Sequence, residues 1–316
     1  MSDRFCRIAR VSRETRICPL LRWCVPRGTR RLFRRGRRFD IPRRATTVLE
    51  SHPRIAAARS SFRTKEPAVG RTLCVANQKG GVGKTTTAVN LAVALAKSGA
   101  RTLLIDLDPQ CNATSGLGQR PAEHHPLVSS QPFKEALFQT TTVNLELLPG
   151  SRNFRDVDAL AQGNQSRSAT LRQHLDAGLT AYDFVLIDCP PSLGQLTRLA
   201  LASSTEVLMP IQCEYFAMEG LTQMIEVIRE VMQQEPGRLR FGGILLTMYD
   251  HALELAREVD DEVRDFFGEI VYRTVIPRDV AVSEAPSHAL SVIDYAPRTR
   301  GARAYVELCM EVLENE

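Results

Sequence analysis

Residues 73–87 read Leu-Cys-Val-Ala-Asn-Gln-Lys-Gly-Gly-Val-Gly-Lys-Thr-Thr-Thr, and they fix the kind of fold this chain must adopt. The four leading apolar residues predict a buried strand, and an apolar period from about Thr85 to Ser98 predicts a helix that Gly99 closes. The loop between them holds three glycines and two lysines. Glycines let backbone N–H groups converge on phosphate oxygens, and the helix N-terminus adds positive potential. This order of strand, loop and helix predicts a polyphosphate site.

The two lysines distinguish the loop from an ordinary glycine-rich turn. Lys84 is placed to reach the β- and γ-phosphates of a nucleotide, and the Thr85 hydroxyl is placed to take one Mg²⁺ position. The common phosphate-loop pattern is not fully met, because Gln78 stands where its first glycine belongs. Lys79 is an additional cation beside that departure. A turn without a ligand is the alternative, but it does not explain two lysines at this spacing.

Outward from the loop, short apolar runs alternate with helical patterns from Arg71 onward. This alternation is typical of a parallel sheet that helices cover on both faces. We therefore predict a doubly wound α/β fold with a mostly parallel sheet. Further strands are predicted at about 102–106, 145–148, 184–188, 207–211, 243–247 and 271–276, and further helices at about 218–232, 253–267 and 303–313.

Acidic residues follow two of these predicted strands. Asp106 and Asp108 are two residues apart, hence on one face of an extended segment, and Asp188 ends a run of four apolar residues. The carboxyl ends of parallel strands meet at one edge of a sheet. Phosphoryl transfer needs a metal held opposite the phosphates and a group that orients the attacking water. An acid after an apolar strand also occurs as a mere helix cap, so the prediction depends on its combination with the loop.

The run 76–87 resembles the deviant Walker A motif of the ParA/MinD superfamily of P-loop NTPases. In that family the first lysine is a signature lysine, which crosses a dimer interface to the ATP of the partner. By this resemblance Lys79 is a trans-acting catalytic cation, comparable in role to an arginine finger. The resemblance implies that the nucleotide is held by Lys79, Gly80, Gly81, Val82, Gly83, Lys84, Thr85 and Thr86.

Two later segments resemble the switches of the same family. Residues 106–114 resemble switch I, with Cys111 where the family usually has glycine, and residues 188–194 resemble switch II. By position, Asp108 is implied to orient the hydrolytic water. The residues implied to hold Mg²⁺ are Thr85, and through water Asp106 and Asp188.

The resemblance extends over nearly all of residues 71–316 and favours the ParA/Soj branch of the superfamily. It implies that the turn Pro277-Arg278-Asp279 borders the adenine base, although the family commonly has asparagine at the place of Asp279. Residues 71–316 are thus expected to form one ATPase domain.

The resemblance also implies a function. It predicts a slow, partner-stimulated ATP hydrolase of chromosome or plasmid partitioning, with ATP and Mg²⁺ as cofactors. The ATP-bound form is expected to be a homodimer bridged by ATP that binds DNA without sequence preference, and the ADP or apo form a monomer. A ParB-like partner is expected to stimulate hydrolysis. The expected location is the cytoplasm, on the nucleoid when ATP is bound. A ParA-like positioning ATPase for a protein cargo and a MinD-like spatial regulator stay open as alternatives.

Charge is divided unevenly along the chain. Residues 1–70 carry 19 Lys and Arg against 5 Asp and Glu, whereas the remainder carries 22 against 31. An acidic body must concentrate its cations locally to meet DNA phosphates. The candidates for DNA contact are Arg298, Arg300 and Arg303, followed by Arg238, Arg240, Arg264 and Arg273. A solvated surface is the simpler interpretation of each arginine alone.

Residues 1–70 show no sustained helical or strand period and are predicted to be disordered in isolation. Three interpretations of this basic extension stay open: an arm for nucleic acid, a transit peptide, and an artefact of the assigned start. No stretch approaches the roughly 20 apolar residues that a membrane-spanning helix needs. No membrane insertion is therefore expected.

Overall fold

The computed structural model describes residues 70–123, 125–126, 132–154, 181–214, 217–234 and 236–315. The predicted basic extension at residues 1–70 lies, apart from its last residue, outside this described part.

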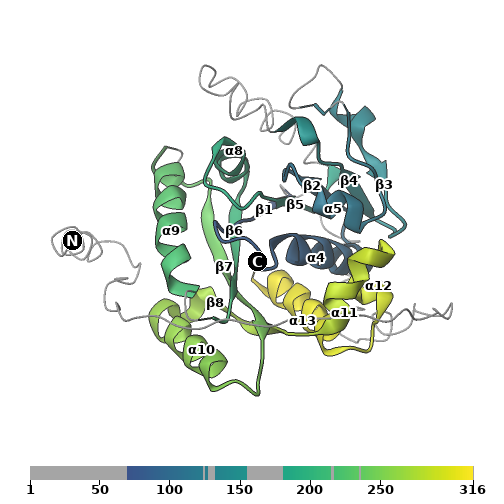
Figure 1. Ribbon diagram of the computed structural model, residues 1–316. Coiled ribbons are helices and arrows are strands. Elements are labelled where there is room, and N and C mark those ends of the chain that lie inside the picture. Colours follow the sequence, from purple (N-terminus) through teal and green to yellow (C-terminus); the bar gives the residue numbers. More distant parts are fainter. Residues whose placement is uncertain are drawn as a thin grey trace.

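Eight strands of the described residues form one sheet, in the order β3-β4-β2-β5-β1-β6-β7-β8 (Figure 1). Every neighbouring pair is parallel except β3 with β4, which is antiparallel at the sheet edge. The strands are β1 Arg71–Val75, β2 Thr102–Asp106, β3 Phe138–Gln139, β4 Leu145–Leu148, β5 Phe184–Asp188, β6 Glu206–Gln212, β7 Arg240–Tyr249 and β8 Val271–Pro277.

Helices and 3-10 turns connect these strands. The α-helices are α4 Lys84–Ser98, α5 Asn112–Gly116, α8 Gln195–Ser203, α9 Ala217–Gln234, α10 Glu254–Phe267, α11 Val280–Glu284, α12 Val292–Tyr295 and α13 Arg300–Glu314. The 3-10 turns are η1 Phe133–Ala136, η2 Arg152–Phe154, η5 Gly268–Ile270 and η6 Ala285–His288.

The central strand β1 divides its side chains between two hydrophobic cores. Leu73 and Val75 pack with α4 and α13 on one face, and Cys74 and Ala76 pack with residues of α8, α9 and α10 on the other. Side chains of a strand alternate between faces, so a strand buried on both faces is apolar throughout. Figure 1 shows the two helical layers on opposite sides of the sheet. The predicted doubly wound α/β fold is confirmed.

The long predicted elements are present, with ends that differ by a few residues. The largest differences are at the starts of β7 and α13, which begin at Arg240 and Arg300 rather than at about residues 243 and 303. The sequence analysis missed β3 and the short helices α5, α8, α11 and α12. These elements span too few residues to show a hydrophobic period, so their formation depends on contacts with the rest of the fold.

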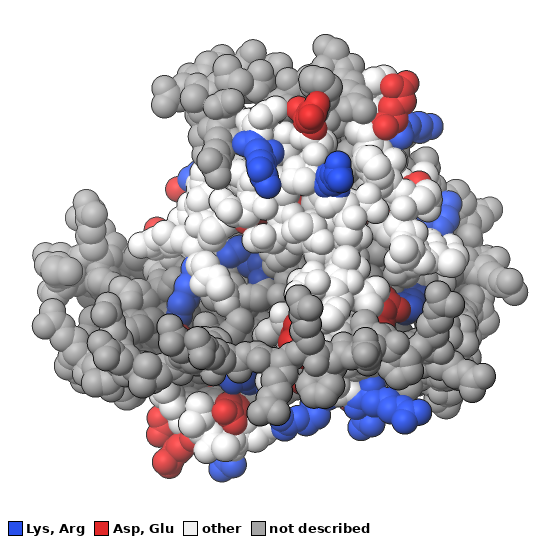
Figure 2. Space-filling model, turned by 45° about the vertical axis from the view of Figure 1, so that its right-hand side comes forward, with Lys and Arg blue, Asp and Glu red and all other residues white. Residues whose placement is uncertain are grey.

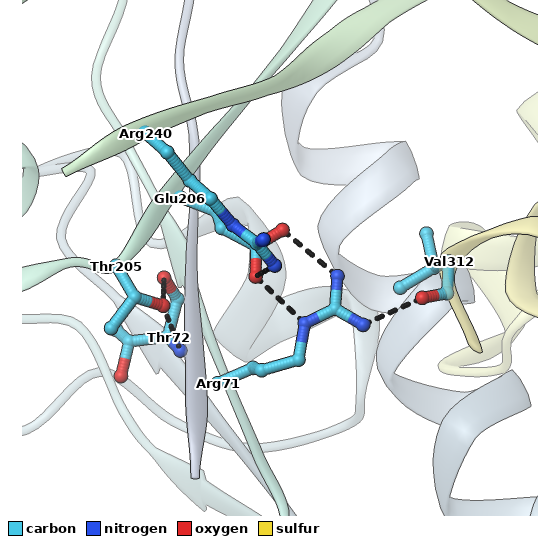
Figure 3. Close-up of polar contacts among 6 residues, drawn as sticks. All are labelled: Arg71, Thr72, Thr205, Glu206, Arg240 and Val312. Carbon is cyan, nitrogen blue, oxygen red and sulfur yellow. Dashed lines mark hydrogen bonds and ion pairs between the residues drawn. The ribbon is translucent and has the colours of Figure 1, made fainter. Parts of the chain in front are cut away.

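A buried carboxylate joins the amino ends of three strands to α13. Glu206 of β6 is 3% exposed and accepts hydrogen bonds from the Arg71 guanidinium at 2.7 and 2.8 Å and from Arg240 at 2.9 Å. Arg71 also donates to the Val312 carbonyl at 2.6 Å, as Figure 3 shows. Burial alone would raise the pKa of Glu206, but the hydrogen bonds and charges of both arginines outweigh it and lower that pKa.

Removing this carboxylate should destabilise the fold. Glu206→Ala leaves Arg71, itself 15% exposed, without its partner, so we expect the free energy of unfolding to fall by about 3 kcal/mol. Glu230→Ala is the matched control, because Glu230 is 54% exposed in its ion pair with Arg198 and should cost less than about 1 kcal/mol. Denaturant unfolding measures both. Equal losses in the two variants would contradict the role given to Glu206.

The same contribution should depend on pH. The pKa of Glu206 is lowered in the folded chain, so its ion pairs stabilise the fold above the ordinary value of 4.5 and lose their effect as pH falls through the lowered value. The difference in free energy of unfolding between the parent chain and Glu206→Gln should be constant near neutral pH and should decrease below about pH 4.5, as denaturant unfolding at each pH would measure.

Candidate functional site

The loop between β1 and α4 depends on glycine for its shape. Gly81 has φ 76° and Gly83 has φ 89°, both in the left-handed region that a side chain disfavours. Gly83 is the residue before α4, and its carbonyl accepts the Thr87 N–H at 2.8 Å. The first N–H groups of α4 are thereby left facing the loop, as a phosphate ligand requires.

Side chains from neighbouring strands fix this loop. The Thr247 hydroxyl at the end of β7 lies 2.8 Å from the Val82 carbonyl and 3.0 Å from the Ile211 carbonyl. The Asn77 amide donates to the Pro210 carbonyl at 2.8 Å. The loop is therefore held in place by β6 and β7 before any ligand arrives.

The two lysines of the loop point to different partners. The Lys84 ammonium is buried and donates to the Lys79 carbonyl at 2.9 Å. Burial lowers its pKa, while the charges of Asp188, Cys189 and Asp108 oppose the shift. The Lys79 ammonium lies 3.4 Å from Glu214, with side chains 34% and 47% exposed. Lys84 thus belongs to the interior of the site and Lys79 to its rim.

The predicted carboxylates meet at the carboxyl edge of the sheet. In the parallel register Asp106 at the end of β2 is opposite Asp188 at the end of β5, and Asp188 is opposite Val75 at the end of β1. Asp106 and Asp188 are fully buried, and Asp108 is 6% exposed. Their charges act on Lys84 and on one another, so the structure brings these acids together with the loop.

Asp106 is held by the chain itself. Its carboxylate accepts the Thr114 N–H at 2.9 Å, the Thr114 hydroxyl at 2.7 Å and the Asp108 N–H at 3.1 Å. Burial raises the pKa of Asp106 to about 6, although these hydrogen bonds oppose the rise. Asp108 in turn accepts the Gln110 N–H at 2.8 Å. Both side chains are therefore fixed in orientation by groups of the segment 106–114 itself.

Asp188 differs, because neither of its buried oxygens has a hydrogen-bond partner of good geometry among the described residues. Burial and the Asp106 charge raise its pKa well above the ordinary value, and the nearby Thr85 hydroxyl and Lys84 only partly oppose this. A buried acceptor without a partner is costly, and a cation or its water shell would satisfy it.

The donor set fits Mg²⁺. No group of three or more His, Cys, Asp or Glu side chains with metal-binding geometry occurs in the part of the chain that the structure describes. Mg²⁺ does not require one, since it keeps several waters and binds through one or two carboxylates together with substrate phosphates. Thr85, the orphaned Asp188 oxygens and the adjoining Asp106 supply the oxygen atoms that such a site uses.

Cys111 stands in a strained conformation at the start of α5. Its φ is 55° and its ψ 39°, the left-handed region where a residue other than glycine costs about 1 kcal/mol or more. The side chain is buried, and burial raises the pKa of its thiol to about 11. The cysteine therefore occupies a position whose backbone suits the glycine usual in the family that this segment resembles.

The turn at residues 277–279 ends β8 and lies at the same edge. Arg278 is exposed, and its N–H donates to the Tyr249 carbonyl at 2.9 Å. Both oxygens of Asp279 bind backbone, one to Ala281 N–H at 3.0 Å and the other to Gly301 N–H at 2.8 Å. Asp279 thus joins the beginnings of α11 and α13, and its adenine contact stays a prediction.

Two of the candidate DNA-binding arginines, Arg264 and Arg273, are already paired with acids. The others lie in two separate places. Arg298, Arg300 and Arg303 are exposed at the start of α13, near Asp279 and the carboxyl edge. Arg238 and Arg240 lie at the amino end of β7, where Arg240 is paired with Glu206. Figure 2 brings the right-hand side of Figure 1 forward and shows Lys and Arg as separate patches with neutral surface between them. The structure does not bring the two groups together.

Four residues that the sequence analysis did not single out complete this site. Thr247 and Asn77 fix the loop, Thr114 fixes Asp106, and Glu214 pairs with Lys79. Each is polar and adjoins an apolar strand or a motif, but no spacing in the sequence identifies its partner. Among the described helices, none combines the length and apolar character that a bilayer span needs.

Known proteins share this chain's sequence and fold. A family profile described as an AAA domain matches residues 70–241. The sporulation initiation inhibitor protein Soj of Bacillus subtilis is 44% identical over 252 residues, which is 78% of this chain and all of that protein. The chromosome partitioning protein ParA of Myxococcus xanthus is 41% identical over 253 residues, or 78% of this chain and 89% of that protein.

Solved structures have a similar fold. Cobyrinic acid a,c-diamide synthase of Mycobacterium smegmatis, solved with an ATP analogue and magnesium, superposes with a TM-score of 0.69 at 34% identity over 78% of this chain and 96% of its own. The cell division ATPase MinD of Pyrococcus furiosus gives 0.64 at 27% identity over 78% and 100%. The fold is therefore that of the P-loop NTPases. The 44% sequence identity to a Soj protein over its whole length shows that the chain belongs to the ParA/Soj family of chromosome-partitioning ATPases.

Proposed function

We propose that this chain is an ATP hydrolase of chromosome or plasmid partitioning, which switches between an ATP-bound, DNA-binding homodimer and an ADP-bound or apo monomer. The observation that carries the proposal is that the two lysines of the loop lie in different parts of the site. Lys84 lies inside the site against the carboxylates, and Lys79 lies on the rim with a third of its side chain exposed. A cation on the rim is available to a second subunit.

Within one subunit, the chain's own groups bind and orient the nucleotide. The N–H groups of the loop at residues 79–86 donate hydrogen bonds to the phosphate oxygens, and Lys84 exchanges the Lys79 carbonyl for phosphate oxygens. Mg²⁺, when bound beside Thr85, Asp106 and Asp188, supplies positive charge opposite the developing negative charge. Pro277, Arg278 and Asp279 border the base.

Asp108 orients the attacking water. One of its oxygens accepts the Gln110 N–H, which fixes the carboxylate, and among the described residues no hydrogen bond engages the other oxygen. That second oxygen is available to align a water molecule. Lys79 leaves Glu214 and reaches the ATP of the partner subunit, so assembly of the dimer completes the catalytic site. Hydrolysis is slow until a ParB-like partner stimulates it, and it ends the dimeric state.

We also propose that residues 71–316 are the ATPase domain and residues 1–70 a separate basic extension, and that the protein acts in the cytoplasm, on the nucleoid when ATP is bound. The main DNA contacts would be Arg298, Arg300 and Arg303, because they are exposed and lie near the carboxyl edge. Arg238 and Arg240 are weaker candidates, since Arg240 already pairs with Glu206.

Lys84→Ala should weaken ATP binding about tenfold or more, since it removes charged hydrogen bonds to phosphate. Lys97→Ala is the matched control, because Lys97 lies on the same helix but pairs with Asp294 at 2.6 Å. Calorimetric titration with a non-hydrolysable ATP analogue measures both variants. Unchanged affinity in Lys84→Ala would refute the assignment of the phosphate loop.

Asp108→Ala should bind ATP and dimerise, while its hydrolysis rate falls by about a hundredfold or more. Phosphate release gives the rate, and light scattering with ATP gives the oligomeric state. Asp261→Ala, which changes an exposed acid on α10, serves as control and should hydrolyse normally. A dimer of Asp108→Ala that hydrolyses at the parent rate would rule out the role of this carboxylate.

Duplex-DNA binding should require ATP and should weaken steeply with salt. Each phosphate contact contributes about 0.9 to the slope of log K against log salt, so replacing Arg298, Arg300 and Arg303 by glutamine should lower the slope by up to about 3. Arg257→Gln is the control on α10. The titration is repeated without residues 1–70, because ATP-dependent binding by residues 71–316 supports partitioning. Binding that vanishes with the extension favours a positioning ATPase for a protein cargo or a MinD-like regulator.

A further inference from the structure

A hollow of about 400 Å³ opens on the surface beside switch I, away from the phosphate loop. Two chain segments form it, one following α5 and one following β4. The residues that line it are Arg120, Pro121, Ala122, Glu123, Arg152 and Asn153.

The two walls of the hollow are joined by hydrogen bonds. The Ala122 N–H donates to the Gly150 carbonyl at 2.8 Å, and the Asn153 amide donates to the Glu123 carbonyl at 3.0 Å. Phe154 and Ser151 beneath the second wall are buried. The hollow is therefore a built feature of the fold with a fixed floor.

The arginines of this hollow make no hydrogen bond or ion pair within the described part of the chain, although the Arg152 charge acts on the nearby Cys111 thiol. Both Arg120 and Arg152 are exposed. Other arginines of the same domain do have acidic partners, among them Arg71, Arg101, Arg198, Arg240, Arg264 and Arg273. Glu123 on the rim is one acid against two guanidinium groups, so the hollow keeps a positive charge.

We propose that this hollow binds a small polyanion that carries two oxyanion groups, phosphate or carboxylate, one on Arg120 and one on Arg152. A guanidinium group presents a planar fork of N–H donors that matches either oxyanion in bidentate fashion. The volume accommodates a molecule of several non-hydrogen atoms rather than a single water. The hollow is separate from the phosphate loop, and the binding of an anion there does not require the function proposed above.

An anion bound in the hollow would contact the wall that follows β4, and this wall adjoins Asp106. Gly150 N–H donates to the Thr114 hydroxyl at 2.8 Å, and that hydroxyl donates to Asp106 at 2.7 Å. A side chain at Gly150 would place its Cβ 2.9 Å from the Asp106 carboxyl carbon. An anion bridging the two arginines therefore clamps a segment that is in direct contact with the catalytic edge.

The site can be tested in the full chain by measuring the rate of chemical modification at each arginine separately. Phenylglyoxal labels arginines, and peptide mass spectrometry gives the rate at each one, with inorganic pyrophosphate in one arm and citrate in the other. Lys84→Ala is the background, which weakens phosphate binding at the loop, and sodium chloride keeps ionic strength equal. We expect Arg120 and Arg152 to be protected saturably with one midpoint, while exposed Arg257 keeps its rate. Protection by pyrophosphate alone assigns a phosphoryl ligand, and protection by citrate alone a carboxylate ligand.

A second variant tests whether the two arginines share one ligand. Arg152→Gln should shift the midpoint of Arg120 protection about tenfold or more toward higher anion concentration, and Arg257→Gln should leave it unchanged. Unprotected Arg120 and Arg152 in both arms would overturn the proposal. So would equal protection of all exposed arginines, or an Arg120 midpoint that Arg152→Gln does not shift.

Discussion

The parallel register of β1, β2 and β5 is the constraint on which this site depends. Hydrogen bonds between these strands set Asp106 opposite Asp188 and Asp188 opposite Val75, and so bring two acids beside the loop that follows Val75. A slip of one residue would turn each acid toward the opposite face of the sheet. The apolar cores on both faces resist such a slip, because they bury every second side chain of β1 on each side. Packing of the core therefore fixes the distances among charged groups that have no direct bond with one another.

The carboxyl ends of the strands are also where the described part of the fold leaves buried polar groups and backbone strain. Asp188 is buried without a hydrogen-bond partner of good geometry among the described residues, Lys84 is buried beside it, and Cys111 has a left-handed backbone. At the opposite edge, the carboxylate of Glu206 is fully paired with two arginines. The contrast is physical: the paired carboxylate of Glu206 stabilises the fold, whereas Asp188 is buried at a cost that a bound cation would relieve.

Much of this arrangement could be predicted from the sequence, because its determinants are local. Apolar runs that end in aspartate indicated strands with acids at their carboxyl ends, and the glycines with two lysines indicated a phosphate loop. The anchors of the loop could not be predicted in this way. Thr247 and Val82 are 165 residues apart, and only the fold shows that they touch. Asp279 is similar: the family resemblance implied that its turn borders the base, but no local pattern showed that its oxygens accept the N–H groups of Ala281 and Gly301.

In the binding mode proposed above, the hydrogen bond from Lys84 to the Lys79 carbonyl would make nucleotide binding an exchange reaction. An incoming phosphate must displace an internal acceptor, so the binding free energy reflects only the difference between the two. A single phosphate at Lys84 would gain only this difference, whereas a triphosphate would add hydrogen bonds from the N–H groups along the loop. Competition from the carbonyl would therefore favour the longer ligand. Because that carbonyl belongs to Lys79, loss of its hydrogen bond to Lys84 would also free the peptide group of the residue whose ammonium lies on the rim.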